Sequence, residues 1–364
     1  MANSAVSLYA LGLDQIENAI RVGGSKRTIL VQGHMGTGKS SLLRTLAKAL
    51  PDHTACYFDC TTKDLGDITI PQLQTLDDQG FVRYVTHEEL GLHLGKPIIL
   101  MIDEYGKANP AVKNALLRLL LERKLGSYDL HPDSIIFATT NLGAEGVGDL
   151  LPPHARNRMT VITARKPTTL EWIEWGITNG VDHAALSFAK DNPHIFQSFE
   201  DVPNPDDNPY IYHPKAPRTA FVTPRSMEAA SDWLKIRDSV DDQTLTAMLI
   251  GTIGERGAMD LMAHVRMADQ LPKLEDIKRD PMHAKVPDSP AAVCMVVYRT
   301  LQVIERDWMD AWMDYMQRLD KEAQGMFANG VRADKYPKQS IVMTNKKFTQ
   351  WAMANNYMFT AEKK

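Results

Sequence analysis

The sequence predicts an α/β fold with a mostly parallel β-sheet in the first half of the chain and an almost entirely helical second half. In the first half, short apolar runs alternate with segments whose apolar residues recur at helical spacing. After Pro167 the strand-like runs stop and only helical patterns continue. We therefore expect an α/β core at residues 1–164, an α-helical lid at 165–270 and a helical C-terminal extension at 271–364.

The elements of the α/β core follow one another in the alternating order typical of a parallel sheet. Residues 7–24 predict an N-terminal helix, and further helices are predicted at residues 39–50 and 110–126. The last of these has a proline in its first turn and a glycine after its end. Apolar runs predict five strands, at residues 27–33, 54–60, 97–104, 133–141 and 158–164. The third strand is nearly all apolar, as expected of a parallel strand covered on both faces.

The second half of the chain contains helical patterns separated by two proline-containing segments. Residues 201–217 carry five prolines and predict an irregular loop within the lid, and residues 271–290 predict a linker. Residues 291–324 predict a long helix or a broken pair of helices. Tryptophan and methionine side chains at helical spacing in this stretch predict a packing face, either within the chain or between subunits: Trp308, Met309, Trp312, Met313 and Met316.

Composition limits the classes of protein that the chain can represent. Hydrophobic residues make up 44% and charged residues 24%, which is ordinary for a globular protein. A net charge of −4 argues mildly against a protein built mainly to bind nucleic acid. The three cysteines, Cys56, Cys60 and Cys294, show no zinc-binding spacing, so we expect them to be buried in a reducing compartment. Without a signal-peptide pattern or a long apolar run, we expect a cytoplasmic protein that does not span a membrane.

A glycine-rich segment, GHMGTGKSS at residues 33–41, lies between a predicted strand and a predicted helix. It matches the phosphate-binding pattern G-x-x-x-x-G-K-[ST]. Glycines let backbone N–H groups point at a phosphate, and the following helix N-terminus favours negative charge. We expect Lys39 to reach the β- and γ-phosphates of a nucleotide and Ser40 to ligate Mg²⁺. The predicted binding residues are Gly33, His34, Met35, Gly36, Thr37, Gly38, Lys39, Ser40 and Ser41.

Two further strand ends carry the groups that hydrolysis would need. The third strand ends in Asp103 and Glu104, and we expect Asp103 to hold Mg²⁺ and Glu104 to activate the attacking water as general base. The fourth strand ends in Asn141, whose amide could position both the γ-phosphate and that water. A cation must also stabilise the charge of the transition state. Arg156 and Arg158 follow the fourth strand, and Arg225 begins a helix in the second half.

In this order the motifs resemble those of AAA+ ATPases, specifically the MoxR-like group. The segments that carry the resemblance are GHMGTGKS, ILMIDE, IIFATTN, LPPHARNRM and TPRS, and the similarity is good over residues 7–235 and weak beyond 270. The resemblance implies a three-layer P-loop NTPase core that binds ATP and Mg²⁺ between subunits of a ring, usually a hexamer. It implies that Arg158 acts on the neighbouring subunit's nucleotide, with Arg156 as the alternative, and that Arg225 reports the nucleotide state. Met159 stands where the family usually has phenylalanine.

The resemblance also implies a chaperone-like motor that remodels or activates a protein client, in related proteins often one with a von Willebrand factor A domain. Residues 68–85 predict a hairpin insert that contacts the substrate or partner, or else has only packing duties. A second hypothesis is a nucleic-acid motor, because basic and aromatic residues interleave at residues 335–359. A third is a nucleotide-gated scaffold that hydrolyses ATP slowly.

Overall fold

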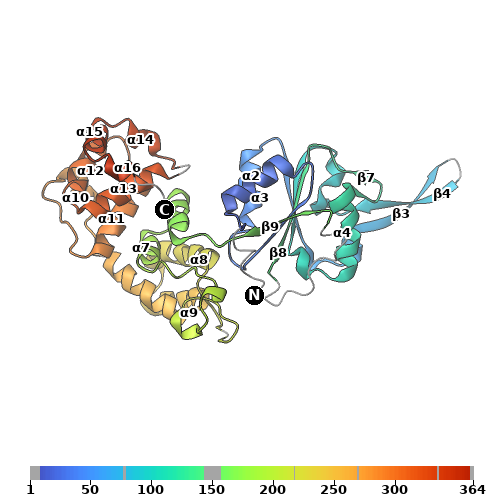
Figure 1. Ribbon diagram of the computed structural model, residues 1–364, viewed down its shortest axis with the longest axis horizontal. Helices are drawn as coiled ribbons and strands as arrows, with labels where there is room; N and C mark the ends of the chain where they lie inside the picture. Colours follow the sequence, from blue (N-terminus) through green and yellow to red (C-terminus); the bar gives the residue numbers. More distant parts are fainter. Residues whose placement is uncertain are drawn as a thin grey trace. The chain divides into compact units, whose positions relative to one another are not determined.

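The computed structural model of the protein describes residues 9–76, 79–142, 157–216, 218–268, 270–333 and 336–360. It divides into two compact units, Met1–Lys166 and Pro167–Lys364 (Figure 1). The described residues form two hydrophobic clusters in the first unit and one in the second. The further division of the second half at residue 270 stays a prediction.

The first unit is built on a five-stranded parallel sheet with the strand order β2-β5-β8-β1-β9. Each of its neighbouring pairs runs parallel. The strands are β1 (Ile29–Gly33), β2 (Thr54–Asp59), β5 (Ile98–Asp103), β8 (Ile135–Asn141) and β9 (Thr160–Ala164). All five coincide with the runs predicted from the sequence, and the predicted α/β fold class is confirmed.

Helices cover both faces of this sheet and give it three layers. On one side lie α2 (Leu13–Gly23) and α3 (Ser41–Ala49), and on the other lies α4 (Pro110–Glu122) (Figure 1). Side chains of a strand alternate between faces. Accordingly Ile99 and Met101 belong to the core beneath α2 and α3, whereas Leu100 and Ile102 belong to the core beneath α4. This two-sided burial explains why β5 is apolar throughout.

Helix α4 ends earlier than the sequence pattern predicts. The side chain of Asn109 caps its start by accepting a hydrogen bond from the Val112 N–H. Its end lies at Glu122, because Arg123 adopts a left-handed conformation with φ of 59°. The chain then forms a small hairpin of β6 (Lys124–Leu125) and β7 (Tyr128–Asp129). The predicted glycine stop, Gly126, is therefore the turn of this hairpin rather than the helix cap.

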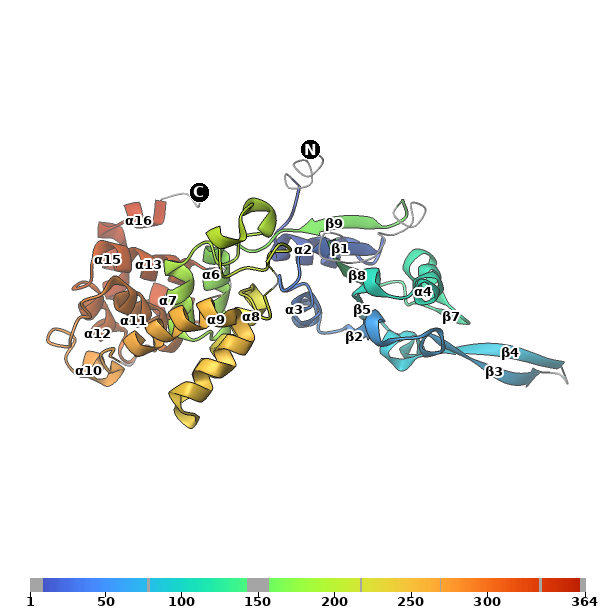
Figure 2. The ribbon, with the colours of Figure 1, turned by 90° about the horizontal axis from the view of Figure 1, so that it is seen from below.

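A longer hairpin, β3 (Thr69–Leu76) and β4 (Gln79–Thr86), forms where the sequence predicted it. Its strands pair in antiparallel register from Thr69 opposite Thr86 to Leu76 opposite Gln79. The hairpin projects from the rest of the first unit (Figure 2). Near its base, the guanidinium of Arg83 lies 5.6 Å from the centre of the Tyr128 ring, which joins the long hairpin to β7.

Short 3₁₀ turns complete the first unit. They are η1 (Cys60–Thr62), η2 (Leu65–Asp67), η3 (Glu88–Leu90), η4 (Leu92–Leu94) and η5 (Tyr105–Lys107).

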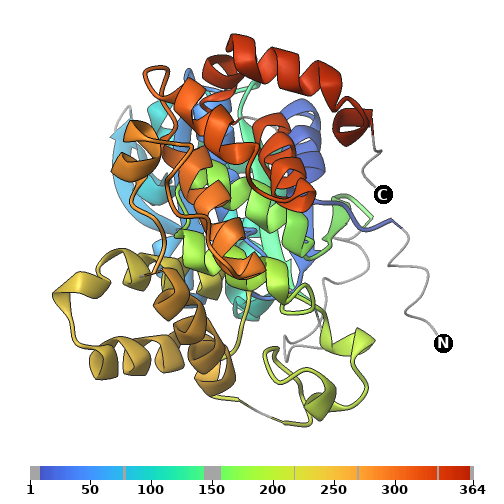
Figure 3. The same cartoon turned by 90° about the vertical axis from the view of Figure 1, so that its left-hand side faces the viewer.

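The second unit is helical and packs around one continuous core (Figure 3). Its helices are α6 (Thr169–Asn179), α7 (His183–Asp191), α8 (Pro224–Lys235), α9 (Asp242–Ala268), α10 (Leu274–Arg279), α11 (Pro290–Val303), α12 (Met309–Met316), α13 (Lys321–Arg332), α14 (Gln339–Met343), α15 (Lys346–Ala354) and α16 (Tyr357–Thr360). The described residues between α7 and α8 are irregular and include the short turns η7 (Phe199–Asp201) and η8 (Pro205–Asp207), as the prolines predicted.

The stretch predicted as a long helix or a broken pair is divided among α11, α12 and α13. The tryptophan and methionine face of α12 is buried within the unit, with Trp312 and Met313 fully inaccessible. That face therefore packs within the chain. The three cysteines are buried free thiols, as predicted. Over the described parts of the chain, no helix is both long and apolar enough to cross a membrane.

Candidate nucleotide-binding site

The candidate site lies at the carboxyl ends of β1, β5 and β8, the edge at which open α/β sheets bind ligands. Strand alternation places its side chains on the α3 side of the sheet. In β8, Ile135 and Phe137 belong to the core beneath α2 and α3, so Thr139 and Asn141 continue the same face at the strand end. Asp103 follows Met101 on that face of β5 in the same way.

The glycine-rich loop between β1 and α3 is held by short-range hydrogen bonds. The Thr37 hydroxyl donates to the His34 carbonyl over 3.0 Å, and the Ser41 hydroxyl donates to the Gly38 carbonyl over 2.7 Å. Gly38 has φ of 94°, a backbone conformation that residues with a Cβ rarely adopt. A Cβ on Gly33 would lie 3.0 Å from the carbonyl oxygen of Ala164 on β9. These glycines fix the path of the loop.

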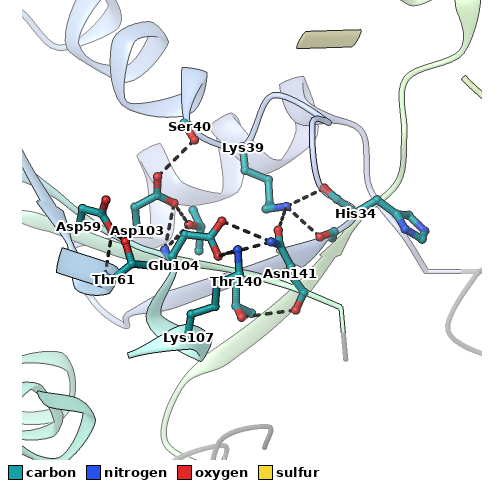
Figure 4. Close-up of polar contacts among 12 residues, drawn as sticks. His34, Lys39, Ser40, Asp59, Thr61, Asp103, Glu104, Lys107, Thr140 and Asn141 are labelled. Carbon is teal, nitrogen blue, oxygen red and sulfur yellow. Dashed lines mark hydrogen bonds and ion pairs between the residues drawn. The ribbon is translucent and has the colours of Figure 1, made fainter. Parts of the chain in front are cut away.

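Lys39 is buried in this loop, with only 6% of its surface exposed. Its Nζ donates to the carbonyls of Gly33 and His34, over 2.8 and 2.7 Å, and to Asn141 Oδ1 over 2.9 Å (Figure 4). An ammonium has three protons. A phosphate oxygen can therefore bond to Lys39 only by replacing one of these acceptors, and the Asn141 side chain is the acceptor that can move.

Asp103 accepts hydrogen bonds at both carboxylate oxygens. Oδ2 accepts from Ser40 Oγ over 3.3 Å and from the Tyr57 hydroxyl over 3.0 Å. Oδ1 accepts from the Thr139 hydroxyl and from the Glu104 backbone N–H. A carboxylate next to a hydroxyl is an oxygen donor set that suits Mg²⁺, which usually takes few protein ligands and completes its shell with phosphates and water. The residues present therefore fit this ion.

Glu104 follows Asp103 but its side chain also reaches the site. Its backbone leaves the strand in a left-handed conformation, with φ of 51° and ψ of 34°. The carboxylate accepts from Asn141 Nδ2, over 3.3 Å at Oε1 and 3.4 Å at Oε2. Lys107 Nζ lies 3.1 Å from Oε2. The backbone turn at Glu104 thus brings two adjacent carboxylates, which a continuing strand would separate, to the same edge.

Besides the loop residues bonded to one another, the structure brings together five predicted site residues through side-chain to side-chain hydrogen bonds. One group joins Lys39, Asn141 and Glu104, and the other joins Ser40 to Asp103 (Figure 4). The two groups meet at Glu104, since its N–H donates to Asp103 Oδ1 over 3.1 Å.

Sequence reasoning missed three residues that contact this cluster: Tyr57, Thr139 and Lys107. The register between β2 and β5 could have identified Tyr57, because Tyr57 pairs with Met101 and therefore lies on the same face of the sheet as Asp103. Thr139 lies two residues before Asn141 in the same strand, hence on the same face. Burial of the phenol and the neighbouring Asp103 carboxylate both raise the pKa of Tyr57, which keeps its hydroxyl protonated as a donor.

Two of the three predicted arginines lie on exposed positions of the described chain. Arg158 is exposed in the turn before β9, and no contact within the described residues joins it to the cluster. Its neighbour Met159 is buried in the core beneath α4. Arg156 lies outside the described residues. Arg225 is an exposed residue in the first turn of α8 in the second unit.

Comparisons with known proteins place the site within a family domain. Residues 28–152 match the model of the AAA domain (dynein-related subfamily). No curated protein matches the chain significantly.

Solved structures similar to this one include Thermotoga maritima RuvB, a Holliday junction branch migration motor, at 17% identity over 76% of this chain and 74% of that chain, with a TM-score of 0.37. A mutant of the same protein matches at 18% identity over 75% and 73%, with a TM-score of 0.37. A Cytophaga hutchinsonii protein provisionally described as an ATPase matches at 13% identity over 72% and 91%, with a TM-score of 0.33.

These low TM-scores add no weight to the family match. The matched range contains the glycine-rich loop, Asp103, Glu104 and Asn141. The similarity to the AAA domain therefore covers the residues of the candidate site.

Proposed function

We propose that the protein hydrolyses ATP at the carboxyl edge of its sheet. The observation that carries this proposal is the contact of Asn141 with both Lys39 and Glu104, which links a phosphate-binding cation to a carboxylate able to accept a proton. Binding alone would need only the loop and Lys39. Hydrolysis also requires a general base, and the Glu104 carboxylate at the other end of the same hydrogen-bonded group supplies one.

Each residue then has a defined task. The loop N–H groups and Lys39 bind the phosphates, and Ser40 and Asp103 would hold Mg²⁺, which neutralises phosphate charge when bound. Asn141 releases Lys39, its Nδ2 then donates to the γ-phosphate, and its Oδ1 accepts a hydrogen bond from the attacking water. Glu104 accepts the proton of that water as its oxygen bonds to the γ-phosphorus, while the bond to the β–γ bridging oxygen breaks and ADP leaves. Tyr57 and Thr139 donate to Asp103 and orient its carboxylate.

A titration with a fluorescent ATP analogue tests the binding step. The intact chain is expected to bind it more tightly with Mg²⁺ than with a chelator, and Lys39→Ala is expected to abolish binding. Lys48→Ala, a change of the same type at an exposed position in the last turn of α3, is the matched control and should bind normally. Equal binding by Lys39→Ala and the intact chain would contradict the assignment.

We further propose a homo-oligomeric ring, of hexameric type, in which Arg158 completes the site of the neighbouring subunit. Support comes from the exposure of Arg158 and from its place between β8 and β9, strands that flank β1 in the sheet. Arg156 remains the alternative finger, and Arg225 the proposed reporter of nucleotide state. Sedimentation with and without nucleotide tests assembly, and a monomer under both conditions would exclude the ring.

The client is proposed to be a protein rather than a nucleic acid. The β3–β4 hairpin exposes large apolar side chains, including Leu73 at 81% and Leu76 at 65%. Arg83 is the one charged residue in its two described strands, and it lies over the Tyr128 ring. Nucleic-acid binding depends on Lys and Arg contacts to phosphate, and among the described residues of these two strands Arg83 alone could make one. A partner with a von Willebrand factor A domain fits the proposal.

The C-terminal segment also disfavours the nucleic-acid alternative. Its aromatic residues Phe348 and Trp351 are 2% and 6% exposed, so they pack in the helical core instead of presenting faces for bases. Lys347 pairs with Asp314 over 2.6 Å. ATPase stimulation by single- or double-stranded DNA, measured across salt concentrations, would favour that alternative.

Deletion of residues 71–80 tests the role of the hairpin, with Leu73→Ser as a milder variant. Turnover is expected to persist while capture of a client by the Glu104→Gln protein is lost. Unchanged capture of the client would indicate that the hairpin has only a packing role. A turnover rate that stays very slow with every client would favour the nucleotide-gated scaffold.

A further inference from the structure

We propose that Gly254 is a positioning residue for Arg225, because the break that it makes in α9 seats the backbone segment that leads into α8. This inference rests on the proposed function, in which Arg225 reports the nucleotide state. It adds the feature of the second unit that determines where Arg225 lies. Arg225 is the second residue of α8 and its side chain is exposed.

Helix α9 is interrupted at Gly254 by a backbone conformation that is essentially restricted to glycine. Gly254 has φ of 81° and ψ of 162°, inside a segment that is otherwise helical from Asp242 to Ala268. The interruption divides α9 into a first arm, residues 242–253, and a second arm, residues 255–268 (Figure 2). A sharp break in a helix at a residue that only glycine can replace indicates a specific requirement at that point.

The first arm of α9 holds the body of α8. The indole Nε1 of Trp233 on α8 donates to the Thr252 hydroxyl on this arm over 3.0 Å. Leu249 on the arm and Met227 and Ala230 on α8 are fully inaccessible members of the same hydrophobic cluster. The first arm therefore fixes α8 along its length.

The second arm of α9 holds the segment that enters α8. A Cβ on Gly257 would lie 3.2 Å from Val222 Cγ2, so Val222 packs directly on this arm. The Val222 N–H also donates to the Tyr210 carbonyl over 2.7 Å, and the Tyr210 hydroxyl donates to Asp260 Oδ2 on the second arm over 2.7 Å. The entering segment is thus fixed to one arm while α8 itself is fixed to the other.

Gly254 lies where the two arms meet, directly against the entering segment. A Cβ at this position would lie 2.6 Å from the carbonyl oxygen of Ala220, closer than Cβ atoms approach other atoms. Because that oxygen belongs to the backbone, a larger residue at position 254 must displace the main chain near Ala220. The displacement would be passed to Thr223, which caps α8, and to Arg225 two residues later.

The test compares Gly254→Ala with Gly251→Ala, a matched control in the first arm, where a Cβ would have nothing within 4 Å. For these variants and for Arg225→Ala we would measure kcat and KM for ATP, the affinity for a fluorescent ADP analogue and the melting temperature. Loss of a hydrogen bond from Arg225 to a phosphate is expected to lower kcat/KM about tenfold or more. We expect Gly254→Ala to lower kcat/KM in the same way and Gly251→Ala to resemble the unmodified protein.

A double variant separates positioning of Arg225 from a general loss of stability. In the Arg225→Ala background, Gly254→Ala should cause no further fall in kcat/KM, because the group that it displaces is already absent. An equal further fall there would overturn the inference, and so would a kcat/KM of Gly254→Ala equal to that of Gly251→Ala.

If Gly254→Ala does not fold, Gly257→Ala gives a milder version of the same comparison, because its Cβ would press on the Val222 side chain instead of on backbone. It should lower kcat/KM less than Arg225→Ala and only when Arg225 is present, and any other result would overturn the inference. Unchanged kcat/KM in Arg225→Ala would instead refute the role proposed for Arg225. Absence of phosphate release from the unmodified protein would refute the proposed function itself.

Discussion

Replacing Glu104 with glutamine separates chemistry from binding and from folding. The change keeps the size of the side chain and leaves an amide oxygen to accept from Asn141, but it removes the carboxylate that would take a proton from water. The loss of a general base typically lowers turnover by about 10²- to 10⁴-fold. Nucleotide binding should survive, because the bonds that hold Lys39 go to the Gly33 and His34 carbonyls and to Asn141, and the Ser40 hydroxyl bonds to Asp103.

The cost in stability can be bounded from the structure. Among the described residues, the ion pair that this change removes is that with Lys107, which is partly exposed, so the free energy of unfolding should fall by less than about 1 kcal/mol. For a unit of this size that corresponds to a fall in melting temperature of no more than about 4 °C. The backbone bond from Glu104 to Asp103 is untouched by the change.

The assay combines phosphate release, binding of a fluorescent nucleotide and thermal melting. Glu122→Gln is the matched control, since it removes a carboxylate from an exposed pair with Arg118, over 3.2 Å, on the same unit. Turnover by Glu104→Gln above about a tenth of the unmodified rate would refute the assignment of Glu104 as the base. Loss of nucleotide binding or a large fall in melting temperature would show that its role is structural.

Three other predictions follow from single groups. Arg158→Ala should stop hydrolysis, and mixing it with unmodified subunits should partly restore activity. Normal hydrolysis by Arg158→Ala together with loss of hydrolysis in Arg156→Ala would instead assign Arg156 as the arginine that acts on the neighbouring subunit's nucleotide. Tyr57→Phe removes one donor to Asp103 and should lower kcat by less than about tenfold with nucleotide affinity retained, whereas unchanged kcat would mean that the phenol does not orient the carboxylate. Burial and the nearby carboxylates raise the pKa of the Cys60 thiol from 9.0 to about 12. Between these values the unfolded chain loses a proton that the folded chain keeps, so the free energy of unfolding should fall as pH rises from 9 to 12. Urea unfolding should show a shallower fall for Cys60→Ala, and an equal slope would contradict this.

Much of the first unit could be predicted because its signals are local. The apolar runs of β5 and β8 predict the strands, and the alternation of side chains along a strand gives the faces to which Asp103 and Asn141 belong. The glycine-rich loop requires glycine at Gly38 for its backbone conformation. These features depend on neighbours in sequence, and sequence patterns record them directly.

Other features depend on tertiary contacts and left little trace in the sequence. The early end of α4 follows from the left-handed conformation of Arg123, a residue type with no preference for it. The contact of Tyr57 with Asp103 requires the register between β2 and β5. Lys107 resembles any surface lysine until the backbone turn at Glu104 brings the two side chains together.

In the second unit, the helix breaks between α11 and α13 occur within a continuously amphipathic pattern. Periodicity alone predicted packing there, with either one helix or two, and could not give the positions of the breaks. The burial of Trp312 within the chain likewise needed the structure, because an apolar helix face fits a core and an interface equally well.

The central claim is that one site both binds and hydrolyses ATP, and phosphate release measured against Mg²⁺ concentration tests it most directly. The purified chain should release phosphate at a rate that saturates with ATP and falls to background in excess chelator, and Lys39→Ala should release none. The account would be contradicted if the unmodified chain neither bound nucleotide nor released phosphate. It would also be contradicted if Lys39→Ala released phosphate at the unmodified rate.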